Sequence, residues 1–291
     1  MVNAIDMPHV CIGMPIYNEE RFIHAALASL RAQDYPNLEI VISDNASTDR
    51  TFEICQEHAA QDSRILVTRI AENRGASANF QCVLEQTKGV YFMWASGHDL
   101  WSPNLVTECV ALLEANQSAC IAFASSNWIG TEGESLSKSS GWTDTRGLAP
   151  AARFFTIFWG NMHPVLGMMR ASEIRGKQPI PPIVGGDLVL LSDLALRGDF
   201  VHASRATWFR REFRTETNYD DKIKRYKSPQ FGIARTRFSR FFPFLALPVA
   251  LIKVVLKSDI PRLDKFATLI ALMPSLVLRY LVGRRKPISP S

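Results

Sequence analysis

The feature that most constrains this sequence is the regular alternation, over its first 124 residues, of short apolar runs with longer segments of helical periodicity. The apolar runs have the length of strands, and the segments between them have the length of helices, which predicts repeated strand–helix–strand units. Such units build a parallel sheet with right-handed crossovers. The expected strands are 9–15, 38–44, 64–70, 89–95 and 119–125, and the expected helices are 18–33, 47–61, 73–87 and 102–116.

The remaining sequence divides by composition into two further regions. Residues 125–150 are rich in Ser, Gly and Thr, which predicts a loop or an irregular hairpin, and residues 187–197 predict a helix. We therefore expect a ligand-binding half over 1–124, a second half over 125–240, and a helical tail over 241–291. The five cysteines are scattered, never in C-x-x-C spacing, and residues 1–10 lack the pattern of a signal peptide. These features favour a reducing, cytoplasmic location.

Charge is distributed unevenly along the chain. The segment 205–291 holds 19 Lys and Arg against 6 Asp and Glu, whereas residues 1–204 hold 14 against 22. Two apolar stretches after residue 241 are interrupted by prolines and charges, so they predict helices that lie on a membrane rather than cross it. An anionic membrane surface is the partner that this pattern favours. A solvated basic face, and packing of the stretches onto the protein's own core, remain open alternatives.

Polar side chains follow four consecutive expected strands, at the edge where ligands bind in open parallel sheets. They are Pro15, Tyr17, Asn18 and Glu19 after the first strand, Asp44 and Asn45 after the second, Asn73, Arg74 and Gly75 after the third, and Ser96, His98 and Asp99 after the fourth. Neither G-x-G-x-x-G nor G-x-x-x-x-G-K is present there, which argues against a dinucleotide or P-loop site. Asn18, Asp44 and Ser47 each have the alternative role of a helix cap or turn former, and either Ser47 or Thr48 is expected to cap the second helix.

Two stretches carry a family resemblance. The run "MPIYNEERFIHAALASLRAQDYPNLEIVISDNASTDRT" and the later "ENRGASANF" resemble glycosyltransferase family 2. The likeness is strong over about 9–115 and weaker over about 160–215. It implies an α/β fold of the GT-A type, with a mostly parallel, Rossmann-like sheet flanked by helices and followed here by C-terminal amphipathic helices. It also implies a nucleoside-diphosphate sugar as donor.

The resemblance assigns roles in the donor site. Pro15, Tyr17 and Glu19 would line the base and ribose, Asp44 would read the base, and Arg74, Gly75 and Ser96 would lie beside the nucleotide. The family's acidic D-x-D motif, which holds a divalent cation, corresponds to Ser96 and His98 here, so the implied metal ligands are His98 and Asp99. Since imidazole suits Mn²⁺ better than Mg²⁺, Mn²⁺ is favoured. Metal-independent binding of the diphosphate and loss of activity remain alternatives.

The second half would supply the catalytic base and further contacts. "VGGDLVLLSDLALRGDF" resembles the family segment in which an acid opens a helix, which assigns the base to Asp187. Its local alternative is a helix cap. "WFRREFR" resembles a basic segment that meets the diphosphate, which points to Arg210 and Arg211, with Phe213 where the family often has histidine. Trp101 is expected to stack on an acceptor sugar, or else to be a core aromatic.

These observations predict an inverting glycosyltransferase at the inner face of the cell membrane, acting on a lipid-linked or polysaccharide intermediate. The first alternative is a catalytically impaired relative of the same fold that serves as a scaffold. The second is a nucleic-acid-binding protein that uses the basic C-terminal third. Because this third lacks interleaved aromatic and basic residues and any recognisable module, nucleic acid is not expected as a partner.

Overall fold

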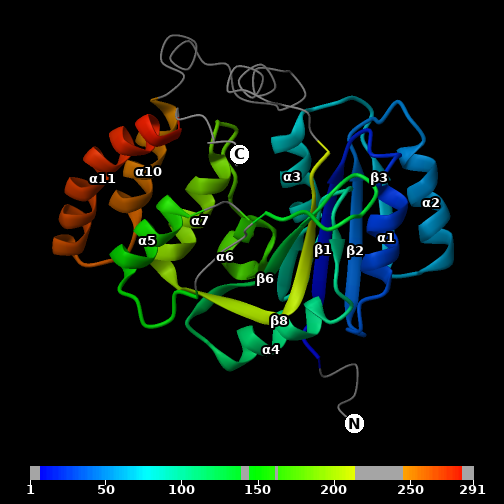
Figure 1. The fold of residues 1–291 in the computed structure, drawn as a ribbon, viewed down its shortest axis with the longest axis horizontal. Coiled ribbons are helices and arrows are strands. Elements are labelled where there is room, and N and C mark those ends of the chain that lie inside the picture. The colour runs from blue at the N-terminus through cyan, green and yellow to red at the C-terminus, as the bar shows by residue number, and fades with distance from the viewer. Residues whose placement is uncertain (1–6, 139–143, 161–162, 214–244, 284–291) are drawn as a thin grey trace.

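The computed structural model describes residues 7–138, 144–160, 163–213 and 245–283, which form one mixed eight-stranded sheet with helices on both faces (Figure 1). The strands are β1 (Val10–Ile16), β2 (Leu38–Asp44), β3 (Ile65–Arg69), β4 (Tyr91–Trp94), β5 (Leu100–Trp101), β6 (Ala119–Ile129), β7 (Met168–Arg170) and β8 (Asp199–Arg211). The helices are α1 (Ile23–Arg31), α2 (Thr51–Gln61), α3 (Ala76–Glu85), α4 (Leu105–Ala115), α5 (Pro150–Trp159), α6 (Ala171–Ile174), α7 (Gly186–Arg197), α10 (Ala246–Lys257) and α11 (Arg262–Gly283).

The strand order is β3-β2-β1-β4-β7-β6-β8-β5. Strands β3, β2, β1 and β4 are parallel neighbours, β6 and β8 are parallel to each other, and β7 is antiparallel to both β4 and β6. The order reverses at β1, which lies between β2 and β4. A reversal of this kind opens a crevice beyond the carboxyl ends of the two flanking strands, where open α/β sheets bind ligands.

The sheet separates two hydrophobic clusters. Alternate residues of β1 point to opposite faces: Val10, Ile12 and Met14 pack with α1 and α4, whereas Cys11 packs with α3, α5 and α7. The second cluster extends outward to Leu251 of α10 and Leu272 of α11. Figure 1 shows the resulting layers, with α1 and α2 on one side of the sheet and α5, α7, α10 and α11 on the other.

The predicted α/β fold is confirmed, but two predicted helix starts are wrong. Helix α1 begins at Ile23 rather than beside Asn18, and α2 begins at Thr51 rather than after Ser47 or Thr48. Asn18 adopts a left-handed φ of 54°, and its Oδ1 accepts a hydrogen bond from Thr48 N at 2.9 Å. The residues predicted as caps therefore bond the two loops to each other instead of starting helices.

Two more differences concern the middle of the chain. Strand β6 continues to Ile129, so the loop predicted from residue 125 begins only after it, and a bridge between Ile129 and Ser135 then forms the irregular hairpin. The helix predicted over 187–197 is confirmed as α7. Residues 241–244 of the first apolar stretch lie outside the described residues.

The predicted C-terminal helices are confirmed as α10 and α11. Pro274, expected to interrupt the second apolar stretch, lies inside a continuous α11. No helix among the described residues combines the length and the apolar character that crossing a membrane requires.

Candidate functional site

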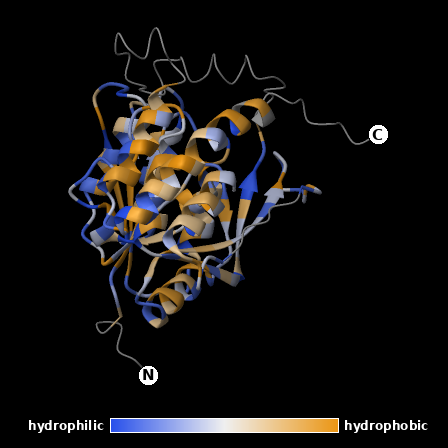
Figure 2. Cartoon of the chain, turned by 90° about the vertical axis from the view of Figure 1, so that its left-hand side faces the viewer, coloured by the Kyte–Doolittle hydropathy of each residue, from blue (hydrophilic) through white to orange (hydrophobic). Residues whose placement is uncertain are grey.

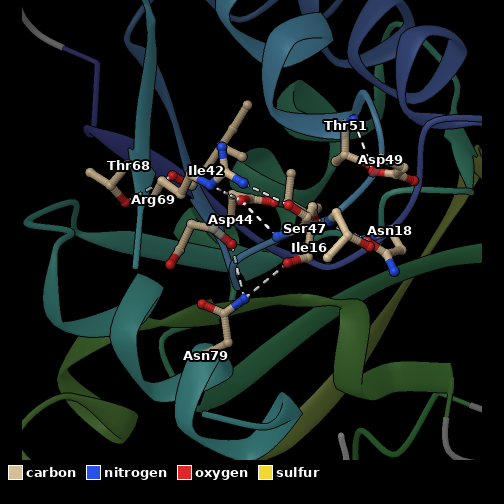
Figure 3. A network of polar contacts seen from close by, with 12 residues as sticks. Ile16, Asn18, Ile42, Asp44, Ser47, Asp49, Thr51, Thr68, Arg69 and Asn79 are labelled. Atoms are coloured by element: carbon tan, nitrogen blue, oxygen red, sulfur yellow. Dashed lines mark hydrogen bonds and ion pairs between the residues drawn. The ribbon is translucent and has the colours of Figure 1, made fainter. Parts of the chain in front are cut away.

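Asp44 lies at the carboxyl end of β2 and is 0% exposed. Its Oδ2 accepts a hydrogen bond from Ser47 N at 3.1 Å and lies 3.2 Å from Nε of Arg69, on neighbouring β3 (Figure 3). Its Oδ1 is buried and has no hydrogen-bond partner among the described residues. Since a buried acceptor without a donor costs free energy, this oxygen is a candidate to accept a hydrogen bond from a ligand.

The loop after β1 is tied to the loop after β2. Asn18 N donates to Ser47 Oγ at 2.9 Å, and Glu19 N donates to Thr51 Oγ1 at 2.7 Å. These bonds hold Pro15 and Tyr17, both half-buried, at the same edge as Asp44. The sequence-based prediction that these residues lie at one edge is therefore correct, but the hydrogen bonds between the two loops could not be predicted from the sequence.

The loop after β3 is held by two asparagines. Asn45 Nδ2 donates to Asn73 Oδ1 at 3.0 Å, and Arg74 N donates to Asn45 Oδ1 at 3.0 Å. Gly75 then starts α3 with φ of 83°, a backbone conformation that favours glycine. Arg74 is left exposed at the edge, where a guanidinium can meet an anionic ligand.

The turn after β4 is fixed to two other parts of the chain. Asp99, 2% exposed, accepts hydrogen bonds from Trp208 Nε1 at 3.0 Å and from Arg211 N at 2.8 Å, both in β8. His98 Nδ1 lies 3.0 Å from Glu19 Oε1, in the loop after β1. A Cβ at Gly97 would lie 2.8 Å from Glu19 Cγ, so glycine leaves room for this contact.

His98 and Asp99 fit a two-residue cation site. Because a carboxylate can only accept, the Nδ1–H tautomer of His98 faces Glu19, which leaves Nε2 as a ligand atom, 4.0 Å from Asp99 Oδ1. A metal-binding histidine commonly gives its other N–H to a carboxylate, and ligating carboxylates are themselves hydrogen-bonded. Asp99 is the more constrained of the two ligands, because both its oxygens already accept bonds from β8. Ser96 Oγ, in the same turn, is buried without a hydrogen-bond partner among the described residues.

Arg211 does not lie as the sequence led us to expect. It is 8% exposed, and its guanidinium donates to His98 O at 2.8 Å, Gly130 O at 2.9 Å and Thr131 O at 2.8 Å. These bonds hold the turn after β4 against the loop after β6, so the guanidinium positions the turn rather than facing a diphosphate.

Arg210 and Phe213 have aromatic neighbours. The guanidinium carbon of Arg210 lies 4.3 Å from the ring centre of Trp128 and 5.5 Å from that of Trp208. Phe213, at the position where the resemblance leads one to expect histidine, packs edge-on against His98 with ring centres 4.6 Å apart. Phe213 therefore supports the imidazole by packing and offers no ligand atom of its own.

Trp101 lies in the core. It is 3% exposed, packs in the cluster that contains α1 and α4, and pairs with Trp208 of β8. It also lines a pocket of about 370 Å³ together with Asn127 and Phe209. This burial agrees with the alternative interpretation of Trp101 as a core aromatic.

Asp187 lies in the first turn of α7, after Gly185 with φ of 81°. Since α7 runs opposite to β8, and β8 runs parallel to β1, α7 begins on the side where β1 ends (Figure 1). Burial raises the pKa of the Asp187 carboxyl, while the hydrogen bond from Leu188 N and the charge of Arg279, on α11, lower it. A carboxyl whose pKa is raised by burial is suited to accept a proton near neutral pH.

One further group of metal-ligand residues lies at the opposite end of the sheet. Among the described residues, His9, Cys11 and Glu39 bring ligand atoms within 4.8 Å of one another. Because they lie near the amino ends of β1 and β2, they cannot join the turn after β4 at the carboxyl ends.

The sequence missed three residues that organise the site. Arg69 pairs with Asp44, and Asn79 Nδ2 donates to Ser43 O at 2.9 Å and lies 3.4 Å from Ile16 O (Figure 3). The third residue, Trp208, donates to Asp99 through its Nε1. Each acts across the sheet or from a distant element. No local sequence pattern marks such contacts.

The fold is that of the GT-A class of sugar transferases. The chain is similar in structure to Staphylococcus aureus TarS 1–349 in complex with UDP-GlcNAc, with a TM-score of 0.67, 15% identity, and coverage of 91% of this chain and 71% of that one. It is also similar to the mannosyltransferase PcManGT from Pyrobaculum calidifontis in complex with GDP-Man and Mn²⁺, with a TM-score of 0.53, 17% identity, and coverage of 94% and 82%. At these identities the likeness shows the fold alone.

The family of the chain is shown by its sequence. The model of the family "Glycosyl transferase family 2" matches residues 11–170, more than half of the chain, so the chain belongs to this family and with it to the transferases.

Two curated relatives align with part of the chain. The Escherichia coli UDP-Glc:alpha-D-GlcNAc-diphosphoundecaprenol beta-1,3-glucosyltransferase WfaP is 30% identical over 42% of this chain. The uncharacterized glycosyltransferase EpsJ of Bacillus subtilis is 32% identical over 38% of it. The aligned regions span 47% and 32% of these relatives, so the chain matches less than half of either.

Proposed function

We propose that this chain transfers a sugar from a nucleoside-diphosphate donor, of the UDP-sugar class, to a hydroxyl acceptor, with inversion by a single in-line displacement. The observation that carries the proposal is that Asp44 Oδ1 and Ser96 Oγ, both at the carboxyl edge of the sheet, are buried and have no hydrogen-bond partner among the described residues. Helix α7 begins beside this edge with Asp187 in its first turn. A donor at this edge would satisfy the unpartnered atoms. Asp187 would take the proton of the acceptor hydroxyl as the acceptor oxygen attacks C1 of the sugar, while the bond from C1 to the diphosphate breaks and the nucleoside diphosphate leaves.

The donor site is assigned to residues that the structure brings to one edge. Asp44 Oδ1 would accept a base N–H, and the exposed Arg74 beside Gly75 would meet the phosphates. The remaining donor contacts are Pro15, Tyr17, Glu19 and Ser96. Two similar structures with bound nucleotides, TarS with UDP and TarS with UDP-GlcNAc, support the choice of donor class.

A divalent cation, when bound, would offset the negative charge of the donor diphosphate. His98 and Asp99 would hold it, with Glu19 orienting the imidazole. An imidazole ligand favours Mn²⁺ over Mg²⁺, which prefers oxygen ligands. The Mn²⁺ in the PcManGT complex is consistent with this choice.

The acceptor is assigned to the region between the donor edge and the C-terminal helices. Residues 1–124 would hold the donor, 125–240 the acceptor and the base, and 241–291 would associate with an anionic membrane surface from the cytoplasmic side. WfaP, whose name gives a diphosphoundecaprenol-linked substrate, supports a lipid-linked or polysaccharide intermediate as acceptor.

A second candidate is a donor-binding relative without transferase activity. It is favoured by Asp99, whose two oxygens are engaged by β8, and by Ser96 and His98 in the places of the acidic motif. Such a protein would bind the donor but not turn it over.

Turnover in Asp187→Asn separates these candidates. Nucleoside-diphosphate release in the presence of acceptor should fall on the order of 10²- to 10⁴-fold, the cost of losing a general base. Donor affinity should stay near that of the wild type. Asp193→Asn, on the same helix but paired with Arg197, is the matched control and should keep its turnover. Full turnover in Asp187→Asn would remove Asp187 from the mechanism, and no turnover in the wild type would favour the second candidate.

A further inference from the structure

Helix α11 presents an apolar side to the surroundings. Six of its large apolar side chains are between 55 and 76% exposed, namely Leu263, Phe266, Ile270, Met273, Val277 and Leu281. Their spacing of three or four residues places them along one side of the helix, which we call the α11 outer face. Every exposed side chain described between Leu263 and Leu281 is apolar. Figure 2 shows this side of the molecule, where the helices carry long hydrophobic segments.

The polar groups of α11 point the other way. Thr268, 1% exposed, bonds to Asp264 O, and the guanidinium of Arg279 lies 5.0 Å from the ring centre of Phe158 on α5. A helix on the surface of a soluble domain normally has the reverse arrangement, with its polar side outward. Exposed apolar patches of this extent are typical of surfaces that bind a protein or a membrane.

We propose that α11 lies in the plane of an anionic lipid surface, with the α11 outer face inserted among the acyl chains. This deepens the proposed function, which assigns residues 241–291 to an anionic membrane surface, by naming the side of one helix that meets the lipid. It rests on the proposed function for that assignment and for the lipid-linked acceptor.

The charges around α11 favour lipid over a second protein. Residues 241–291 contain eight Lys and Arg against two Asp and no Glu. Lys257, the last residue of α10, and Arg262, the first residue of α11, are both exposed, next to the start of the apolar side. Basic residues beside an apolar helix face are the combination that binds anionic headgroups and acyl chains together. A bare apolar face without these charges would fit a protein partner equally well.

The proposed orientation places the membrane next to the candidate base. The inner side of α11 carries Arg279, whose charge acts on Asp187 of α7, and α10 and α11 both pack in the cluster that contains α7. A lipid-linked acceptor held in the headgroup region would therefore reach the site from the α11 side.

Sedimentation with lipid vesicles tests the proposal on the full chain. The wild type should bind vesicles that contain phosphatidylglycerol more tightly than vesicles of phosphatidylcholine alone. The triple variant Leu263→Ser, Phe266→Ser and Ile270→Ser should bind these vesicles roughly 100-fold more weakly, since it removes three large apolar side chains that would insert into the lipid. Lys257→Gln with Arg262→Gln should lose roughly tenfold at low salt and less at high salt.

A matched control removes exposed apolar residues elsewhere. Leu66→Ser with Val90→Ser changes side chains that are 49 and 56% exposed, on β3 and just before β4. This variant should bind vesicles as the wild type does. Equal binding by the triple variant and the wild type would overturn the proposal.

A fluorescence measurement on a helix that keeps its apolar side covers the case in which the triple variant fails to fold. Phe266→Trp keeps a large apolar side chain in the α11 outer face, where Phe266 is 64% exposed. The fluorescence of this tryptophan, taken as the difference between Phe266→Trp and the wild type, should be quenched by brominated phospholipids. Absence of quenching would overturn the proposal, because the helix would then not contact the acyl chains. A dimer in analytical ultracentrifugation that the triple variant abolishes would overturn it in favour of a second copy of the chain. Donor binding by the wild type is measured separately, and its absence would refute the proposed function while leaving the vesicle result to stand.

Discussion

The two adjacent arginines at the end of β8 give a sharp test of how the site is built. Arg211 donates three hydrogen bonds to backbone carbonyls on two loops, whereas Arg210 stacks on Trp128 and Trp208. A hydrogen bond from a charged group contributes about 1.5–3 kcal/mol, and glutamine can retain part of one. We therefore expect Arg211→Gln to lower the free energy of unfolding by at least about 3 kcal/mol, the low end for the two bonds that glutamine cannot replace.

Arg210→Gln is the matched control. It removes cation–π contacts worth about 0.5–1 kcal/mol each at exposed sites, so its destabilisation should be about 1 kcal/mol. At about 2–4 °C per kcal/mol for a domain of this order of size, the thermal midpoint should fall by roughly 6–12 °C in Arg211→Gln and by roughly 2–4 °C in Arg210→Gln.

Differential scanning fluorimetry without ligand measures both midpoints, and calorimetric titration measures donor affinity. If Arg211 instead binds the diphosphate, Arg211→Gln would melt within about 1 °C of the wild type and lose donor affinity. That result would refute the positioning role derived from its three backbone contacts.

Two further predictions concern the base and the cation. Burial raises the pKa of Asp187 and the charge of Arg279 lowers it, so Arg279→Gln should let this pKa rise further. Since the base acts when deprotonated, the acid limb of the profile of kcat against pH should then move to higher pH. An unchanged acid limb would contradict the coupling between Arg279 and Asp187. Removing metal with EDTA should abolish transfer, and Mn²⁺ should restore it better than Mg²⁺. His98→Asp should improve the use of Mg²⁺. Undiminished transfer in EDTA would contradict the cation site.

The elements that local patterns determine were predictable from the sequence. The apolar run at 38–44 coincides with β2, and the helix predicted over 187–197 differs from α7 by one residue. Buried parallel strands and amphipathic helices carry their periodicity in consecutive residues. Because strand–helix–strand units make neighbouring strands parallel, the sequence also predicted that the carboxyl ends of these strands share one edge. Asp44 and the turn after β4 were therefore expected at the same edge.

Contacts between distant segments were not predictable. Asn18 resembles a helix cap in its local sequence, but its partner Thr48 lies 30 residues away. The antiparallel β7 and the long β8 depend on pairings across the sheet. Trp101 is buried where β5 pairs with β8, and Arg211, at the end of β8, is fixed by its contact with Asp99. A short apolar or basic run does not indicate which strand it will pair with, so the burial of its side chains is known only from the structure.

The most direct test of the central claim is the thermal shift of the full chain with UDP-, GDP- and dTDP-sugars in the presence of Mn²⁺. At a hundredfold excess over the dissociation constant, a bound donor adds about 2.7 kcal/mol to the free energy of unfolding, which corresponds to roughly 5–10 °C. The account predicts such a shift for at least one sugar nucleotide and its loss in Asp44→Asn, which replaces one carboxylate oxygen by an NH₂ donor. The absence of any shift, or an undiminished shift in Asp44→Asn, would contradict a donor site at the carboxyl edge of the sheet.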